Sequence, residues 1–179
     1  FFNTWGFIGI FLGLVIILAS FTSLYRNYFI YGVNNFFVNN NALIAHIGVG
    51  ITILGITCSS VFQSEFNQSF KLNEKVELNG YLFELEDIKI FEKENYQELM
   101  ASFVVSQYNQ ILTKINPSKR YYHVSKIITT EAGIYHRWFE DIYIVLGNEK
   151  NQKWNVKIYQ NPFVSFIWIG VILMILSGL

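Results

Sequence analysis

Charge is scarce in this sequence, and long stretches of the chain lack it. Charged residues make up 15% of the 179 residues, against about 25% in an average soluble domain. Arg26 is the only lysine or arginine before residue 65, and no acidic residue precedes Glu65. Residues 1–64 and 161–179 are therefore nearly uncharged, and residues 65–160 carry almost every charge. This division is typical of a membrane protein with one soluble insert.

Several function classes lose support from what the sequence lacks. Residues 65–160 hold 12 basic and 13 acidic residues, a net charge of −1, and no basic stripe suggests a nucleic-acid partner. The single cysteine, Cys58, excludes a disulfide within the chain, and we expect it to be a small buried side chain near a helix end. The motifs G-x-S-x-G, H-E-x-x-H and C-x-x-C are absent, as is a Gly-rich phosphate loop.

Long apolar runs are what the sequence has instead, with 52% hydrophobic residues and a mean hydropathy of +0.30. They predict membrane-spanning helices at about 4–24, 41–62 and 163–179. At about 1.5 Å per residue the last run reaches about 25 Å, short of a bilayer core of about 30 Å. Because the chain also begins at an apolar Phe1 rather than Met, we expect it to be part of a larger polypeptide or one subunit of a split one. Asn161-Pro162 is expected to open the last helix, with Asn as its cap and Pro at its first position.

The segment 25–40 sets the expected orientation. It contains Arg26 and no acid, and short positive loops stay cytoplasmic. The sequence therefore predicts two membrane helices within 1–62, an extracytoplasmic domain at 63–161 and a membrane helix at 162–179. The compartment outside would be the bacterial periplasm, with the protein in the inner membrane, or the mitochondrial intermembrane space.

The soluble insert has the pattern of an all-β domain. Asn79-Gly80 separates two β-rich runs and predicts a hairpin with a type I′ turn, whereas the polar segment 91–98 indicates a loop. In residues 154–159 apolar and polar side chains alternate, as in a half-buried strand. Further strands are expected at 101–106, 120–130, 141–146 and 153–159. About seven short strands fit a small barrel or sandwich.

A histidine stands inside the second apolar run. An ionisable residue in a membrane segment is a functional-site hypothesis by default, and neutral imidazole is what a metal or haem iron needs. Ala42 and Gly50 lie four residues to either side of His46, and Gly48 and Gly55 are nearby. Small residues there would let a flat ring such as a porphyrin approach the backbone. The alternative, equally weighted, is that the glycines serve helix packing and His46 bonds a neighbouring helix.

The other polar candidates lie in the soluble insert. His123 and His136 match no metal-ligand spacing, and surface or hydrogen-bonded structural roles are expected. Glu131 is expected to pair with Arg120 or Lys126 as an ordinary exposed ion pair, which contributes little.

The stretches 116–147 and 154–178 resemble one family, the CcmF family of cytochrome c-type biogenesis proteins, also called CycK or NrfE. The matching pieces follow one another in order across the chain: Pro117-Ser118-Lys119-Arg120-Tyr121-Tyr122, Thr130-Glu131-Ala132, Asp141-Ile142-Tyr143-Ile144-Val145-Leu146-Gly147, Trp154, Pro162-Phe163, Ile167-Trp168-Ile169-Gly170 and Leu173-Met174. Upstream, Ala45-His46-Ile47-Gly48-Val49 and Asn95-Tyr96 fit the same pattern. The resemblance covers roughly residues 40–179.

This resemblance implies a fold, an activity and a set of partners. It implies a helical membrane protein with an inserted extracytoplasmic β domain. It also implies a haem lyase component that joins haem to apocytochrome c, working with a CcmH-type thiol subunit and the haem chaperone CcmE. The family holds a b-type haem between two transmembrane histidines. One of these lies in a stretch that matches residues 45–48, which makes His46 an expected axial ligand of the haem iron.

The resemblance also has gaps. The family's Trp-rich haem-docking loop, its flanking histidines and its second transmembrane ligand have no counterpart in this chain. The partner of His46 is therefore expected on an N-terminal half, and no complete catalytic site is expected here. Arg120 is a candidate contact for a haem propionate, because guanidinium suits carboxylates. The alternatives are a haem transporter and a non-catalytic structural subunit of a membrane assembly complex.

Overall fold

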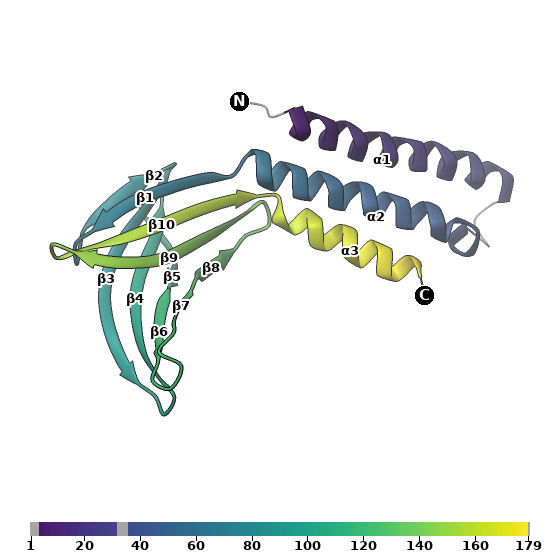
Figure 1. The fold of residues 1–179 in the computed structure, drawn as a ribbon. Helices are drawn as coiled ribbons and strands as arrows, with labels where there is room; N and C mark the ends of the chain where they lie inside the picture. The colour runs from purple at the N-terminus through teal and green to yellow at the C-terminus, as the bar shows by residue number, and fades with distance from the viewer. Residues whose placement is uncertain (1–3, 32–35, 179) are drawn as a thin grey trace. The chain divides into compact units, whose positions relative to one another are not determined.

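The computed structural model describes residues 4–31 and 36–178, and within these ranges the chain forms three helices and ten strands (Figure 1). By internal contacts the chain divides into two compact units. We call the first the helix unit (Phe1–Gln63, Arg137–Glu140 and Asn161–Leu179) and the second the β unit (Ser64–His136 and Asp141–Gln160). The expected membrane class with an all-β insert is confirmed. Of the expected range 63–161, six residues group with the helices by internal contacts, namely Gln63, Arg137–Glu140 and Asn161, and the domain bounds stay a prediction.

The helix unit contains α1 (Thr4–Tyr31), α2 (Phe36–Val61) and α3 (Val164–Ser177). The first two are long and apolar enough to cross a membrane, and α3 is a shorter apolar helix. The segment 25–40 was expected as a loop, but most of it is helical, because no proline or glycine interrupts the apolar sequence before Gly32. Residues 32–35 lie outside the described residues, and the cytoplasmic placement of this segment stays a prediction.

Glycines bring the helix backbones close together. A Cβ atom on Gly48 of α2 would lie 2.6 Å from the carbonyl oxygen of Gly170 in α3. One on Gly50 would lie 3.0 Å from the carbonyl oxygen of Gly13 in α1. Small residues allow this close approach in membrane helices, where van der Waals packing drives association. Helix α2 thus packs with one side against α1 and with another against α3 (Figure 1).

The start of α3 differs from the expectation. Asn161 and Pro162 end strand β10, and the cap residue is Phe163, which has a left-handed φ of 62° and no side-chain cap bond. A left-handed φ is unfavourable for a bulky residue. Two contacts hold it: its N–H donates to the carbonyl oxygen of Phe139 at 2.7 Å, and its ring stacks on that of Phe166. Asn161 instead accepts a hydrogen bond from Gln63 at 2.6 Å.

The β unit is built from two sheets. The first has the strand order β1 (Ser64–Phe70), β10 (Lys153–Pro162), β9 (Glu140–Lys150) and β8 (Gly133–His136). The second has the order β2 (Lys75–Leu78), β3 (Tyr81–Glu92), β4 (Tyr96–Gln107), β6 (Ser118–Tyr122) and β7 (Ile128–Glu131), and β5 (Gln110–Ile115) also pairs with β4. The ladders whose register is resolved are antiparallel.

The core of the β unit draws on both sheets, and its largest fully buried side chains include Phe70, Phe83, Phe103, Ile144 and Ile158. The rings of Phe70 and Phe103 meet edge to face, with centroids 5.3 Å apart, a favourable aromatic geometry. The expected alternation in β10 is confirmed, because Val156 and Ile158 are buried while Asn155 and Lys157 are exposed.

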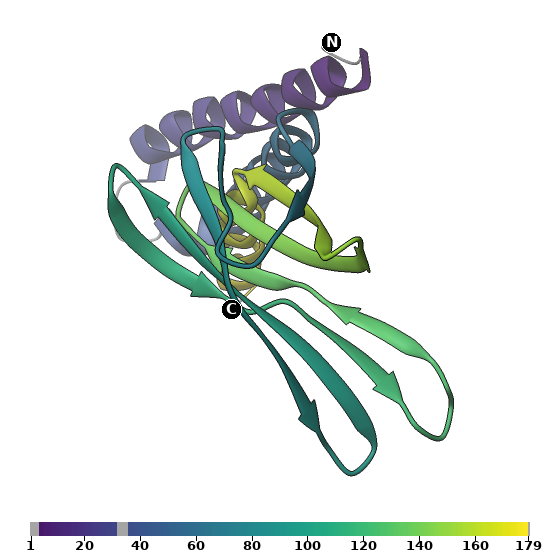
Figure 2. The same cartoon turned by 90° about the vertical axis from the view of Figure 1, so that its left-hand side faces the viewer.

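The turns of the second sheet bear out one prediction and correct another. Asn79 and Gly80 both have positive φ, and Leu78 pairs with Tyr81, as a type I′ hairpin requires. The segment 91–98 was expected as a loop, but the ladder between β3 and β4 continues to the pair Glu92 and Gln97. Cross-strand pairing overrides the weak β propensity of this polar segment. Figure 2 shows this hairpin projecting beside the one formed by β6 and β7.

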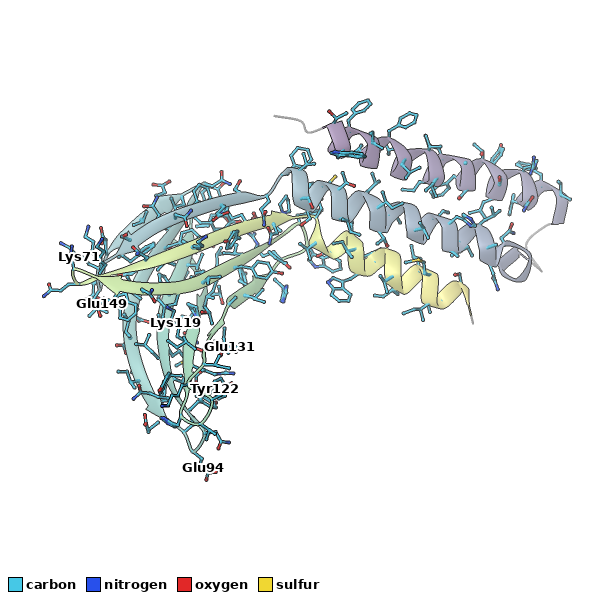
Figure 3. The ribbon with its side chains drawn as sticks, viewed as in Figure 1. Lys71, Glu94, Lys119, Tyr122, Glu131 and Glu149 are labelled. Carbon is cyan, nitrogen blue, oxygen red and sulfur yellow. The ribbon has the colours of Figure 1, made fainter. Side chains whose placement is uncertain are left out.

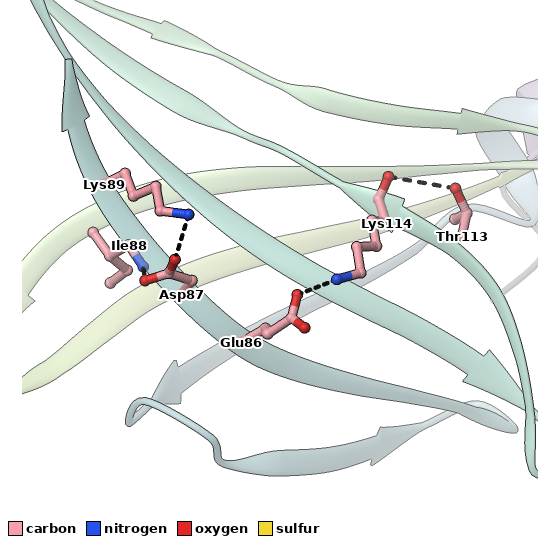
Figure 4. A network of polar contacts seen from close by, with 6 residues as sticks. All are labelled: Glu86, Asp87, Ile88, Lys89, Thr113 and Lys114. Carbon is pink, nitrogen blue, oxygen red and sulfur yellow. Dashed lines mark hydrogen bonds and ion pairs between the residues drawn. The ribbon is translucent and has the colours of Figure 1, made fainter.

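A β-bulge interrupts β3 at Glu86, because Leu85 and Asp87 pair with consecutive residues of β4. Two ion pairs surround the bulge (Figure 4). Glu86 meets Lys114 of β5 at 2.6 Å, and Asp87 meets Lys89 at 2.9 Å. The Lys89 ammonium and the backbone N–H of Ile88 lower the pKa of Asp87. The bulge adds local twist to a strand that continues from the core into the projecting hairpin.

A polar cluster joins β4, β6 and β7 in the projecting part of the second sheet. Glu98 accepts a hydrogen bond from the Ser118 hydroxyl at 2.7 Å and one from Nε of Arg120 at 2.9 Å. Arg120 also meets Glu131 at 3.5 Å and lies over the Tyr96 ring, 5.2 Å from its centroid. The Ser118 and Arg120 hydrogen bonds lower the pKa of Glu98 from its ordinary value of 4.5.

We predict that Gly48→Ala destabilises the helix unit although alanine is the better helix former. The new methyl group would meet backbone atoms of α3, which cannot rotate away, and such overpacking costs about 1–3 kcal/mol. The measurement is detergent-driven unfolding followed by circular dichroism. Gly178→Ala is the matched control, since its Cβ atom would meet nothing closer than 3.5 Å. Equal stability of the two variants would contradict the prediction.

We predict that Glu98→Gln makes the stability of the β unit less dependent on pH in the acid range. The pKa of Glu98 is lowered on folding, so its stabilising effect is present above the unfolded pKa and is lost as pH falls through the folded pKa. At neutral pH the variant should be less stable than the wild type by about 1 kcal/mol, the value of a typical hydrogen bond. On acidification below pH 4.5, the stability of the variant should fall less than that of the wild type. Thermal midpoints between neutral and acid pH measure both effects. Glu94→Gln, at an exposed turn residue (Figure 3), controls for the change in charge.

Candidate functional site: the exposed face of helix α2

Helix α2 carries an exposed stripe along the side that α1 and α3 leave free. The exposed positions follow a spacing of three, four and seven residues, which places them on one helix face. They are Ala42, His46, Val49, Ile56 and Ser60. We call this set the α2 stripe. His46 is its only ionisable member, so any polar chemistry on this face centres on the imidazole.

The imidazole of His46 is oriented by its own helix. Its Nδ1 lies 2.5 Å from the carbonyl oxygen of Ala42, one turn earlier. Because a carbonyl oxygen can only accept, this contact requires the proton on Nδ1. In the neutral ring the lone pair is then on Nε2, the atom that points away from the helix backbone. A histidine held in this way can bind a metal ion or haem iron through Nε2.

The glycines near His46 serve helix packing rather than an open face. Gly48 and Gly55 face α3, where a Cβ atom would overlap Gly170 and Ile167. Gly50 was expected to share a small-residue face with His46, but the Ile17 side chain of α1 covers it. Of the two small neighbours expected beside the ring, only Ala42 lies on the exposed stripe. A planar ligand would therefore approach His46 across Ala42 and Val49.

The other two histidines have structural partners in the β unit. Nδ1 of His136 lies 2.9 Å from Oδ2 of the buried Asp141, and Nε2 of His123 lies 3.7 Å from Glu92. Both imidazoles are exposed, so the expected surface or hydrogen-bonded roles are confirmed. No group of three or more His, Cys, Asp or Glu residues that could hold a metal ion occurs within residues 4–31 and 36–178.

Arg120, the expected propionate contact, is engaged within the β unit. Its guanidinium pairs with Glu98 and Glu131, as described above, and both carboxylates come from neighbouring strands. The expected pairing of Glu131 with Arg120 is confirmed (Glu131 is labelled in Figure 3). A propionate would compete with these carboxylates. The propionate role stays a prediction, and the geometry supports a role in holding three strands together.

The β unit also has an open groove of about 530 Å³ that sequence reasoning did not find. Its lining is rich in amide and hydroxyl side chains and comes from β1, β6, β7, β9 and β10. Lys119 lies in it and donates to Asn148 at 2.6 Å, and burial lowers the pKa of Lys119 (Figure 3). Lys157 pairs with Glu65 at 3.3 Å. The five strands are distant in sequence, so no local motif marks the groove.

Comparison with known proteins places these features in one family. The family model described as the CcmF C-terminal beta-sandwich matches residues 61–162. The cytochrome c-type biogenesis protein CcmF of Pseudomonas aeruginosa is 35% identical over 136 residues, which are 75% of this chain and 21% of that protein. The probable cytochrome c-type biogenesis protein NrfE of Escherichia coli is 28% identical over 172 residues, 96% of this chain and 29% of that protein. The chain thus spans less than a third of the length of these relatives.

A solved structure shares the fold. The structure titled Cytochrome c Heme Lyase CcmF matches 94% of this chain and 29% of its own chain, with a TM-score of 0.76 at 15% identity. That likeness extends the match beyond the β unit to the helices on either side of it. With more than half of its length matched by the family model, this chain belongs to the CcmF family and contains that family's C-terminal β-sandwich.

Proposed function

We propose that this chain is the C-terminal membrane part of a cytochrome c haem lyase, and that His46 is an axial ligand of a b-type haem. The names of its relatives support the general role, since they are called cytochrome c-type biogenesis proteins. The solved structure of the same fold is titled a haem lyase. The specific role of His46 rests on the geometry of the α2 stripe.

The observation that carries the proposal is the hydrogen bond from Nδ1 of His46 to the carbonyl oxygen of Ala42. It fixes the ring orientation and leaves Nε2 as the ligating atom, the arrangement that protein ligands of metals commonly have. A haem iron held there would supply or accept one electron by changing between its ferrous and ferric states. The apolar neighbours of His46 on the stripe, Val49 above all, would exclude water from the ring.

The site would need a second side. The packed faces of α2 are covered by α1 and α3, so a ligand for the opposite face of the haem has to approach the α2 stripe from outside this helix unit. The relatives are several times longer than this chain, and we propose that their N-terminal part provides that ligand. The protein would lie in the inner membrane. Delivery and attachment of haem would then occur in the periplasm, beside the β unit.

The partners follow from the same proposal. Apocytochrome c would supply the thiols of the covalent bond, a CcmH-type subunit would keep them reduced, and the chaperone CcmE would deliver haem. We propose no side chain of this chain as a nucleophile in the attachment of haem. The polar surface of the β unit is the part of this chain that we propose these partners contact.

We predict that His46→Ala abolishes the b-type visible absorption of the purified protein, expressed together with the N-terminal part of its polypeptide. The substitution removes the ligating Nε2 atom without adding bulk to an exposed position. Ile56→Ala, further along the same stripe, is the matched control and should retain the spectrum. In His46→Gly, added imidazole should restore the absorption, because the free ring can occupy the vacated space.

The outcomes separate ligation from packing. Full haem retention in His46→Ala would contradict the proposed role, as would a loss that imidazole fails to restore in a protein of normal size-exclusion profile. A purely structural subunit would show no b-type spectrum in any variant, including the wild type.

A further inference from the structure

The turn between β8 and β9, residues Arg137–Glu140, belongs to the helix unit. Two hydrogen bonds hold it to the beginning of α3. The N–H of Phe163 donates to the carbonyl oxygen of Phe139 at 2.7 Å, and the hydroxyl of Ser165 donates to that of Arg137 at 3.3 Å. We call these four residues the β8–β9 turn. Its position at one end of the helix unit is thus set by bonds to two residues at the start of an apolar helix.

This turn presents two large aromatic side chains. Trp138 is 77% exposed and Phe139 is 69% exposed. The charged residues on either side pair with each other, since Nη1 of Arg137 lies 3.4 Å from Glu140 and its backbone N–H donates to the Glu140 carbonyl at 3.0 Å. Exposed apolar surface that is rimmed by polar groups marks an interaction site. The combination of aromatic tips with an ion pair at their base suits a boundary between an apolar and a polar phase.

Other exposed aromatic residues lie at the same end of the helix unit. Gly6 of α1 packs against Val61 of α2, and Gly55 of α2 packs against Ile167 of α3. The start of α1, the end of α2 and the start of α3 therefore share one end. Exposed aromatic residues near this end include Trp5 and Phe7 of α1, Phe62 just after α2, and Trp168 in the first turns of α3.

A second aromatic group marks the opposite end of α1, where Tyr25, Tyr28 and Phe29 are exposed. From residue 5 to residue 25 a helix rises about 30 Å at about 1.5 Å per residue, the thickness of a bilayer's hydrocarbon core. Tryptophan and tyrosine gather at the two interfaces of a membrane. The two aromatic groups are thus spaced as two interfaces are, and the β8–β9 turn lies at one of them.

We propose that the β8–β9 turn is a lipid-contacting element that inserts Trp138 and Phe139 into the headgroup layer of the bilayer. We choose lipid as the contacting partner because the turn is continuous with the apolar outer surface of the helix unit. The aromatic residues of that unit mark the membrane interface at the same end. This inference does not depend on haem binding.

The test uses the full polypeptide in phosphatidylcholine vesicles, with Trp138→Cys in a background free of other cysteines, including Cys58→Ala, and an environment-sensitive NBD label. An interfacial element lies about 5–10 Å into the headgroup and acyl boundary. We expect blue-shifted emission that lipids with a nitroxide near the head group quench several-fold more than lipids with one at mid-chain. Phe139→Cys provides a second labelled site if Trp138→Cys fails to fold. Tyr108→Cys is the matched control, an aromatic residue of a β-unit turn that is 91% exposed.

Each outcome decides the matter. Blue-shifted emission without quenching by either lipid would show that protein covers the turn, which overturns the proposal. Emission as red as that of the label at Tyr108 would place the turn in water, with the same consequence. Stronger quenching from mid-chain would contradict an interfacial position. Haem binding, recorded on the same samples, distinguishes failure of this inference from failure of the proposed function.

Discussion

The close approach of helix backbones at glycine positions is the constraint on which the proposed site depends. Gly48 and Gly170 bring α2 onto α3, and Gly13 and Gly50 bring it onto α1. Helices embedded in lipid have no hydrophobic driving force to associate, so this tight packing decides which faces of α2 are covered. The face that remains carries His46. A larger side chain at any of these glycines would shift or rotate α2 and would thereby move the imidazole.

The β unit meets a different physical problem, which is how to keep a long, partly exposed hairpin ordered. Its core is a packed aromatic and aliphatic layer, but β3 and β4 extend beyond that core. There the Arg120 cluster ties β4, β6 and β7 together, with Glu98 as the shared acceptor. Because folding lowers the pKa of Glu98, the order of this part of the sheet depends on pH. The turn between β8 and β9, in contrast, takes its order from the helix unit.

Sequence reasoning succeeded where the signal is local and failed where distant segments compete. The charge-free runs predicted the helices, and Asn79-Gly80 predicted its hairpin, because hydropathy and left-handed φ preferences act over a few residues. Asn161-Pro162 looked like a helix start, yet these residues end strand β10, just beyond the Ser64–Gln160 pair of its ladder with β1, and Phe163 is the cap residue. The segment 91–98 was expected to be a loop because its residues are polar. In the structure it belongs to the ladder between β3 and β4, which its composition does not reveal.

The sequence by itself determined the membrane class, the all-β insert, the family resemblance and His46 as the residue to examine, because each depends on composition, on short-range periodicity or on ordered motifs. Only the tertiary structure decided that the glycines around His46 pack against α1 and α3. It alone brought Arg120 to Glu98 and Glu131 and grouped Arg137–Glu140 with the helices. Those outcomes depend on contacts between residues far apart along the chain, and the packing of whole elements selects such contacts rather than any local preference.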